Sequence, residues 1–254
     1  MYRGMDRAAL DAAYNNAAAV KDSAQIVAQW EGRSARLRAA HPEGMDLRYG
    51  PDERNRIDFF AARRDAPVLA FIHGGYWQNR SKEVFSFVAE GPLAWGINVA
   101  LIGYTLAPQK RLDGIVAEIR AALDWLDEKY GNKLLVSGWS AGGHLTAMAM
   151  NHPAVEAGLA ISGIYDLEPI RHCYVNDKLG LDEAEARRNS PGPTAKPLVL
   201  AYGADELPNL RDQSENYARR LGREAMALPR HNHFTILEEL ASPQGALTGV
   251  VRTL

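Results

Sequence analysis

The sequence lacks the features that mark secreted, membrane-spanning and highly charged proteins. It has one cysteine, Cys173, in 254 residues, so it can form no internal disulfide, which suits a reducing compartment. Its most apolar stretches, such as 67–72 and 98–102, are far shorter than the roughly 18 residues that span a bilayer. Charged residues interrupt the first twenty positions, where a secretory signal needs an unbroken apolar stretch. We therefore expect a cytoplasmic protein without a membrane segment.

An excess of charge of either sign is also missing. Lys and Arg number 29 and Asp and Glu number 31, which gives a formal net charge of -2. No global positive field is then available to hold nucleic acid or an anionic lipid surface. We expect neither as a partner, and the sequence leaves open whether the chain forms an oligomer.

The composition is that of an ordinary globular domain. Hydrophobic residues make up 46% and charged residues 24%, close to the averages for such domains. The length suits one domain with a sizeable core. We find no internal repeat or interdomain linker, so we predict a single domain over residues 1–254.

Short apolar runs alternate with amphipathic stretches from residue 46 onward. Residues 67–72 are apolar on both faces, as in a central strand covered by helices on both sides. The alternation predicts an α/β fold with a mostly parallel sheet. The predicted strands are 46–49 and 56–60, which form an antiparallel edge, and 67–72, 97–102, 134–137, 157–162, 197–202 and 224–228. The predicted helices begin near 81 and after 140, and cover 113–130, 210–221, 235–240 and 244–254.

Two further segments depart from this alternation. Residues 6–40 are rich in alanine, with apolar residues at helical spacings, and predict two amphipathic helices that form an N-terminal cover over 1–43. Residues 165–193 are irregular and contain several Pro and Asn residues. A long irregular insertion is often a lid or a substrate wall, and the alternative is a surface excursion with one short helix around 182–188.

The strongest chemical signal is the segment from Gly138 to Gly142, with Ser140 at its centre. It follows the apolar strand 134–137 and precedes a helical stretch, which is the setting of a nucleophile elbow. The glycines permit a sharp turn that presents the Ser140 hydroxyl at a helix N-terminus. The alternative, a glycine-rich turn with an ordinary serine, does not explain why strand, turn and helix all agree.

A serine that attacks a carbonyl needs hydrogen-bond donors for the negative charge that develops on the oxygen. Gly74 and Gly75 follow the predicted central strand 67–72, where an α/β-hydrolase carries its oxyanion loop. We predict that their amides, together with that of Ala141, form the oxyanion hole. A plain tight turn is the alternative.

The serine also needs a base, and the chain order of an α/β-hydrolase puts the acid and then the histidine after it. Only His231 and His233 lie late enough, and we favour His233 because it directly precedes an apolar helical stretch. A metal site at these two histidines is the alternative, but no third ligand with familiar spacing accompanies them. Asp205 and Glu206 both follow the strand 197–202, and either could orient the base.

Six stretches carry a resemblance to a known family. They are Tyr14-Asn15-Asn16, His73 to Gln78 with Tyr76-Trp77 at its centre, 137–145 around Ser140, 162–169, Gln213-Ser214 and His233-Phe234. In these the chain resembles the kynurenine formamidase branch of the α/β-hydrolases, close to the hormone-sensitive-lipase-like esterases. The resemblance extends over most of the chain, and the Tyr-Trp pair after the glycines distinguishes this branch from the esterases.

The resemblance implies a serine hydrolase without cofactor or metal that cleaves N-formyl-kynurenine, a small aromatic molecule, into kynurenine and formate. It also favours Glu206 over Asp205, because the family's carboxylate precedes a Pro by two residues and a Gln-Ser pair by seven. One departure is Trp139, where many relatives carry a polar residue. Tyr76, Trp77 and Trp139, with Tyr104 and Tyr174, are candidates for an aromatic pocket, although core packing explains each equally well.

Two other functions use the same residues. A carboxylesterase, carbamate hydrolase or lactam hydrolase would carry the same serine, histidine and carboxylate, since fold and triad set the reaction class but not the leaving group. A binding module that retains the fold without catalysis is the third reading, which the presence of all three groups disfavours.

Overall fold

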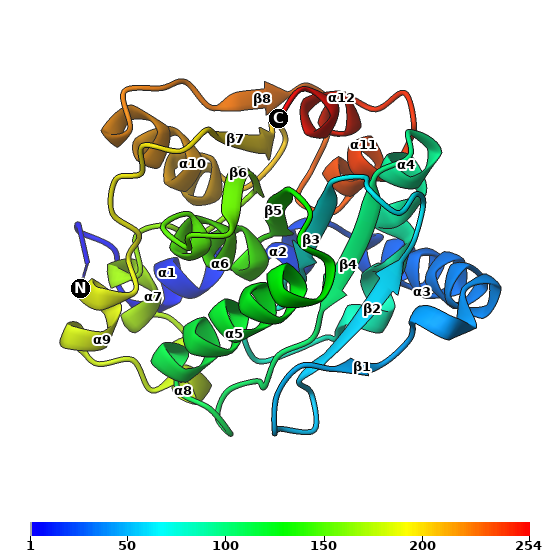
Figure 1. The fold of residues 1–254 in the computed structure, drawn as a ribbon. Coiled ribbons are helices and arrows are strands. Elements are labelled where there is room, and N and C mark those ends of the chain that lie inside the picture. Colours follow the sequence, from blue (N-terminus) through cyan, green and yellow to red (C-terminus); the bar gives the residue numbers. More distant parts are fainter. Residues whose placement is uncertain (1) are drawn as a thin grey trace.

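The computed structural model describes residues 2–254, so that Met1, the first residue of the predicted domain, lies outside it. Within these residues one eight-stranded sheet runs through the molecule in the order β1-β2-β4-β3-β5-β6-β7-β8 (Figure 1). The strands are β1 (Leu47–Arg48), β2 (Arg56–Phe60), β3 (Val68–Ile72), β4 (Asn98–Ile102), β5 (Leu134–Trp139), β6 (Val155–Ile161), β7 (Leu198–Gly203) and β8 (Met226–Leu228).

The pairing confirms the predicted α/β fold. β2 pairs antiparallel with both β1 and β4, and every later pairing is parallel. All five residues of β3 and of β4 are buried, as expected of strands with helices on both faces. The carboxyl ends of β3, β5, β6 and β7 consequently meet at one edge of the sheet.

Helices cover both faces of this sheet (Figure 1). Alternate strand residues, such as Ala70 and Phe71, point into two separate apolar clusters. One cluster packs under α5 (Leu112–Tyr130), α6 (Ala141–Ala149) and α10 (Pro208–Arg220). The other packs under α3 (Ser23–Ala40), the 3-10 helix η2 (Lys82–Ala89), α11 (Glu238–Ala241) and α12 (Ala246–Thr253). The remaining helical segments are α1 (Arg7–Ala13), α2 (Asn16–Ala19), η1 (Pro42–Gly44), α4 (Glu90–Ala94), α7 (Glu168–Arg171), α8 (Asn176–Leu179), α9 (Glu183–Arg188) and η3 (Thr235–Leu237).

The structure corrects the predicted elements in two segments. The N-terminal cover holds three helices instead of two, because the side chain of Asn15 accepts a hydrogen bond from the Ala18 amide and starts a new helix after α1. Residues 165–193, for which the alternative of a surface excursion included one short helix, contain α7, α8 and α9. Asp182 caps the predicted one, α9, through the Glu185 amide, and helices this short depend on such caps and on tertiary contacts.

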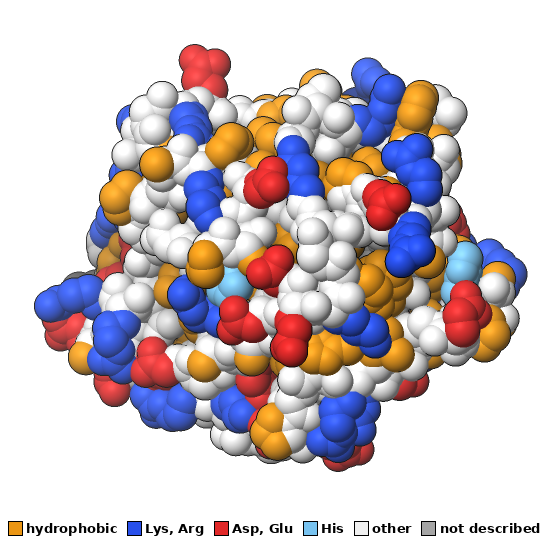
Figure 2. Space-filling model, viewed as in Figure 1, with side chains coloured by type: hydrophobic (Ala, Val, Ile, Leu, Met, Phe, Trp, Pro, Cys, Tyr) orange, Lys and Arg blue, Asp and Glu red, His pale blue; other side chains and the backbone are white. Residues whose placement is uncertain are grey.

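The surface shows no concentration of one charge on the side drawn in Figure 2, where cations, anions and apolar side chains alternate. Between Tyr2 and Leu254, no helix has the length and apolar character that crossing a bilayer requires.

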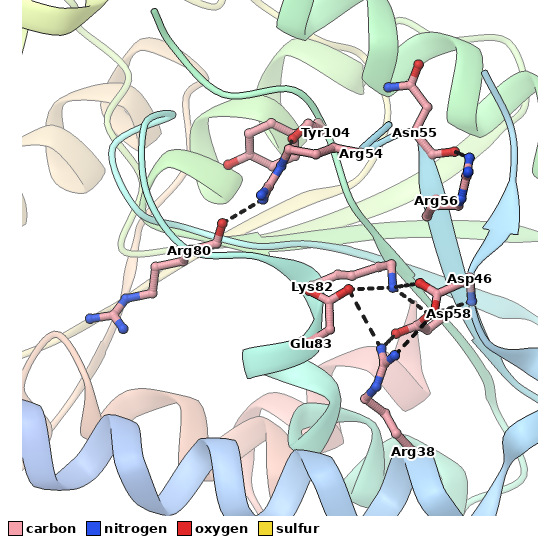
Figure 3. Close-up of polar contacts among 10 residues, drawn as sticks. All are labelled: Arg38, Asp46, Arg54, Asn55, Arg56, Asp58, Arg80, Lys82, Glu83 and Tyr104. Atoms are coloured by element: carbon pink, nitrogen blue, oxygen red, sulfur yellow. Dashed lines mark hydrogen bonds and ion pairs between the residues drawn. The ribbon is translucent and has the colours of Figure 1, made fainter. Parts of the chain in front are cut away.

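A buried group of charges joins α3 to the antiparallel edge of the sheet (Figure 3). The ammonium of Lys82 lies 2.7 Å from Asp58 Oδ1, 2.6 Å from Asp46 and 2.7 Å from Glu83. Asp58 is fully buried on β2 and also accepts a hydrogen bond from Arg38 of α3. A buried charge is tolerable only when it is paired, and Asp58 is the fully buried one of the three carboxylates that compensate Lys82 and Arg38.

Replacing Asp58 should therefore be costly. We expect Asp58→Ala to lower the free energy of unfolding by about 1.5–3 kcal/mol, the usual cost of losing hydrogen bonds to charged groups, since Lys82 and Arg38 lose their fully buried partner but keep Asp46 and Glu83. Urea denaturation measures this, with Asp65→Ala at an exposed loop position as the control. Equal stability of the two variants would contradict the role of Asp58.

Candidate active site

Ser140 stands at the sharp turn between β5 and α6. Its backbone has φ 58° and ψ -118°, a conformation that costs free energy in a residue with a side chain and is typical of functional turns. The turn requires Gly142, since a Cβ there would collide with the carbonyl of Ile72 on the neighbouring strand. The Ser140 amide donates to the Ile161 carbonyl at 2.9 Å. The serine is thus held at the carboxyl edge of the sheet, as the sequence predicted for an elbow.

The structure brings His233 and Glu206 together. Nδ1 of His233 lies 2.8 Å from Oε2 of Glu206, and both side chains are buried. Glu206 follows β7 and His233 lies beyond β8, so the strand ends carry both groups to the edge where Ser140 stands. Asp205, the alternative acid, is exposed. The geometry distinguishes the two neighbouring carboxylates, which the residues alone did not.

Ser162 is a site residue that the sequence analysis did not identify as such. Its hydroxyl donates to Oε1 of Glu206 at 2.6 Å, and the Gly203 amide donates to the same oxygen at 2.7 Å. The Glu206 carboxylate therefore has hydrogen bonds on both oxygens, which fixes its orientation toward His233. A polar residue directly after the apolar strand β6 was the available signal, because ligands and catalytic groups gather at such strand ends.

Ser140 and His233 line one cavity of about 450 Å³, a volume within the roughly 300–1,000 Å³ of small-molecule sites. Gly75, Tyr76 and Trp139 line it as well, whereas Gly74 and Ala141 are buried beside it. The other lining residues are Asn16, Ala17, Glu31, Asn79, Arg80, Val84, Tyr174 and Phe234. Tyr174 comes from the irregular segment 165–193, which thus contributes to the wall.

The loop after β3 carries backbone N–H groups that can donate hydrogen bonds to a ligand. Gly75 has φ 113°, a region that favours glycine, and a Cβ there would meet the Asn79 carbonyl. Among residues 2–254 no acceptor is found for the amides of Gly75 and Ala141. These N–H groups are available to a ligand oxygen.

Trp139 connects this loop to the histidine. Its indole Nε1 donates to the His233 carbonyl at 2.7 Å, and the two rings lie 4.7 Å apart. The six-membered part of the indole packs against the backbone of Gly74. Trp139 is therefore one of the residues that fix the position of His233.

Trp77 does not line the cavity, contrary to the prediction. Positive φ values at Tyr76 and Trp77, 50° and 58°, turn the indole into the core, where it is fully buried. Its Nε1 donates to Nδ1 of His144 at 3.2 Å, and Nε2 of His144 donates to the Asn189 carbonyl at 2.6 Å. Tyr104 is likewise buried and donates to the His73 carbonyl at 2.9 Å.

The histidines outside the cavity have structural contacts. His231 lies 3.1 Å from Glu239 and does not pair with His233. In the part of the chain that the structure describes, no group of three His, Cys, Asp or Glu side chains is arranged to hold a metal ion.

The comparisons with known proteins agree on a hydrolase family. A family model described as BD-FAE matches residues 60–181. Kynurenine formamidase from Danio rerio is 31% identical over 240 residues, which cover 84% of this chain and 82% of that protein. Esterase LipC from Mycobacterium tuberculosis is 32% identical over 140 residues, covering 46% of this chain and 35% of that protein. The crystal structure of a candidate thioesterase from Silicibacter sp. superposes with a TM-score of 0.90 at 27% identity, covering 96% of this chain and 98% of the other.

The hydrogen bond from Ser162 to Glu206 should matter for turnover. We expect Ser162→Ala to lower kcat by roughly tenfold, since losing about 1.4 kcal/mol of support for the carboxylate has that effect on a rate. Steady-state kinetics measure it. Ser137→Ala is the matched control, because Ser137 is an equally buried serine that donates to the neutral Leu159 carbonyl. An equal change of kcat in both variants would argue against a specific role for Ser162.

The buried His144 should make stability depend on pH. Burial lowers the pKa of His144 to about 4, whereas a histidine in an unfolded chain titrates near 6.5. Between these values the unfolded chain binds a proton that the folded chain does not, so stability falls as the pH is lowered. We expect this residue to contribute a loss of about 2 kcal/mol between pH 7 and pH 5.

Urea denaturation at several pH values checks this expectation in wild type, His144→Gln and the control His41→Gln, whose histidine does not line the cavity. The dependence on pH should be shallower in His144→Gln alone. Parallel curves for all three proteins would show that His144 does not contribute.

Proposed function

The chain belongs to the kynurenine formamidase family of α/β-hydrolases, it is a hydrolase of the ester or amide type, and we propose that its substrate is N-formyl-L-kynurenine. The products are kynurenine and formate, which assigns the enzyme to tryptophan catabolism. The observation that carries the proposal is that Ser140 and His233 line the same cavity, with Glu206 on the far side of the imidazole.

In the first half of the proposed reaction, the Ser140 hydroxyl attacks the formyl carbon and His233 takes its proton. Glu206 accepts the Nδ1 hydrogen of His233 and stabilises the imidazolium that forms. The carbonyl oxygen becomes an oxyanion, which Gly75 and Ala141, with Gly74 beside them, receive through their amides. The tetrahedral intermediate then collapses: the C–N bond breaks, and His233 returns the proton to the departing aromatic amine.

In the second half, water hydrolyses the formyl ester on Ser140. His233 again acts as base and removes a proton from the attacking water. The serine leaves with the proton from the imidazolium, and formate is released. No cofactor is required at either stage, since the same three side chains and two or three amides serve both.

The cavity walls support an aromatic leaving group. Tyr76, Trp139 and Tyr174 line it, and aromatic side chains offer a large apolar surface to a flat ring. Tyr76 and Tyr174 meet edge to face with ring centres 6.3 Å apart. We propose that the segment 165–193 acts as a substrate wall through Tyr174.

A second candidate function is supported by the similarity to esterases. The decisive measurement is kcat/KM on N-formyl-L-kynurenine beside kcat/KM on p-nitrophenyl acetate. We expect the formamide to be the better substrate. Turnover of the phenyl ester alone, with no release of kynurenine, would replace the formamidase proposal with a carboxylesterase.

The role of Ser140 has a direct test. We expect Ser140→Ala to lower kcat by roughly 10⁴-fold or more, since the covalent route is then closed, while the thermal unfolding midpoint changes little. A fluorophosphonate should label Ser140 in the folded wild-type protein, as shown by mass spectrometry of the peptide. Ordinary turnover by the variant, or no adduct on the wild type, would overturn the proposed mechanism.

A further inference from the structure

Besides Asn79, three polar side chains line the cavity without a role in the proposed reaction. They are Asn16 of α2, Glu31 of α3 and Arg80, which follows the loop after β3. Asn16 and Glu31 come from the N-terminal cover, and Arg80 comes from the segment between β3 and η2. The hydrogen-bond partners and the charge of each side chain indicate which ligand groups it can bind.

Arg80 has a negative charge in its surroundings, Glu31, but forms no direct ion pair among the described residues. Within residues 2–254 no carboxylate lies within 4.0 Å of its guanidinium, although the side chain is half-buried. Figure 3 shows the guanidinium extending away from the charge group around Lys82, with no interaction drawn to it. Because an arginine stays protonated, a half-buried and unpaired guanidinium on a cavity wall is ready to bind an anion.

The backbone holds Arg80 in this position at some cost. Arg80 has φ 72°, an unfavourable value for a residue with a side chain. Its carbonyl accepts a hydrogen bond from Nη2 of Arg54 at 2.6 Å, and Nε of Arg54 donates to the Tyr104 carbonyl at 2.8 Å. The strained backbone thus persists because Arg54 fixes it, as at many ligand-binding positions.

Asn16 provides an unused acceptor. Its side chain is only 6% exposed, and its Oδ1 has no hydrogen-bond partner among the described residues. The hydroxyl of Tyr76 donates to the Tyr14 carbonyl at 2.5 Å, so it can only accept from Nδ2 of Asn16, at 3.2 Å. This network leaves Oδ1 as the free atom, and a buried acceptor without a partner is costly unless a ligand supplies a donor.

Glu31 adds a negative charge at the same cavity. It is exposed, and in the described part of the chain it forms no ion pair, including none with Arg80. An anion and a cation that face one cavity without contacting each other match a ligand that carries both charges. The free amino-acid group of N-formyl-L-kynurenine is such a ligand.

We propose that Arg80 binds the α-carboxylate of the substrate, while Asn16 and Glu31 bind its α-ammonium group. The cavity thereby selects aryl formamides that carry a free amino acid over simple aryl formamides. This inference rests on the proposed formamidase function. It names the groups that give the site its specificity and leaves the catalytic residues unchanged.

The test compares three substrates that differ only in the head group. N-formyl-L-kynurenine carries both charges, N-formylkynuramine lacks the carboxylate, and formanilide lacks the whole amino-acid side chain. The aliphatic stem of Arg80 packs beside Gly75, so the variant must keep that stem. Arg80→Gln removes the charge and retains most of the stem, and Arg80→Lys restores a charge.

We expect Arg80→Gln to lower kcat/KM for N-formyl-L-kynurenine by about 10- to 100-fold, as the loss of a hydrogen bond between charged groups predicts. Turnover of N-formylkynuramine and formanilide should not fall, and Arg80→Lys should recover part of the loss. Glu31→Gln should lower kcat/KM for the two ammonium-bearing substrates but not for formanilide. Arg36→Gln, which removes an exposed cation of α3 that does not line the cavity, is the control for net charge.

The outcomes separate this inference from the proposed function. A wild-type enzyme that cleaves all three substrates equally well, or an equal loss on all three in Arg80→Gln, would overturn the head-group role and leave the formamidase function standing. A wild-type enzyme that cleaves neither N-formyl-L-kynurenine nor formanilide would overturn the formamidase function itself.

Discussion

The Glu206 carboxylate is the point on which the arrangement of the site depends. It receives hydrogen bonds from Ser162 after β6, from the Gly203 amide at the end of β7 and from His233 beyond β8. Three separate stretches of chain are therefore aligned on one buried group. Because a carboxylate in the interior is stable only when its oxygens are satisfied, the placement of the imidazole depends on the strand ends that supply these hydrogen bonds.

Local patterns predicted the sheet and the turn at Ser140, because alternation of apolar runs and the spacing of glycines act over a few residues. The sequence also predicted that His233 and one of two adjacent carboxylates would lie nearby. It did not choose between Asp205 and Glu206 without the family resemblance, since the choice depends on which way each side chain points after the turn. Trp77 was misplaced for the same kind of reason: two positive φ values reverse the direction of its indole.

Contacts between segments that lie far apart in the sequence could not be predicted from local patterns. His152 is buried and lies 3.0 Å from Asp124, 28 residues away, a contact that no local pattern predicts. Nothing in the immediate neighbours of Asn16, Glu31 and Arg80 places them on a common wall, although Asn16 lies in one of the stretches that carry the family resemblance. The three short helices of 165–193 lack apolar periodicity and depend on caps and neighbours.

The N-terminal cover contacts residues that line the cavity, in addition to covering the sheet. Trp30 of α3 meets Trp139 edge to face with ring centres 5.7 Å apart, and the Tyr14 carbonyl holds Tyr76. The wall is thus built from segments that lie outside the sheet and far from Ser140 in the chain. Such segments can diverge during evolution without altering the turn at Ser140, so the shape of the cavity can change through substitutions in the periphery of this scaffold.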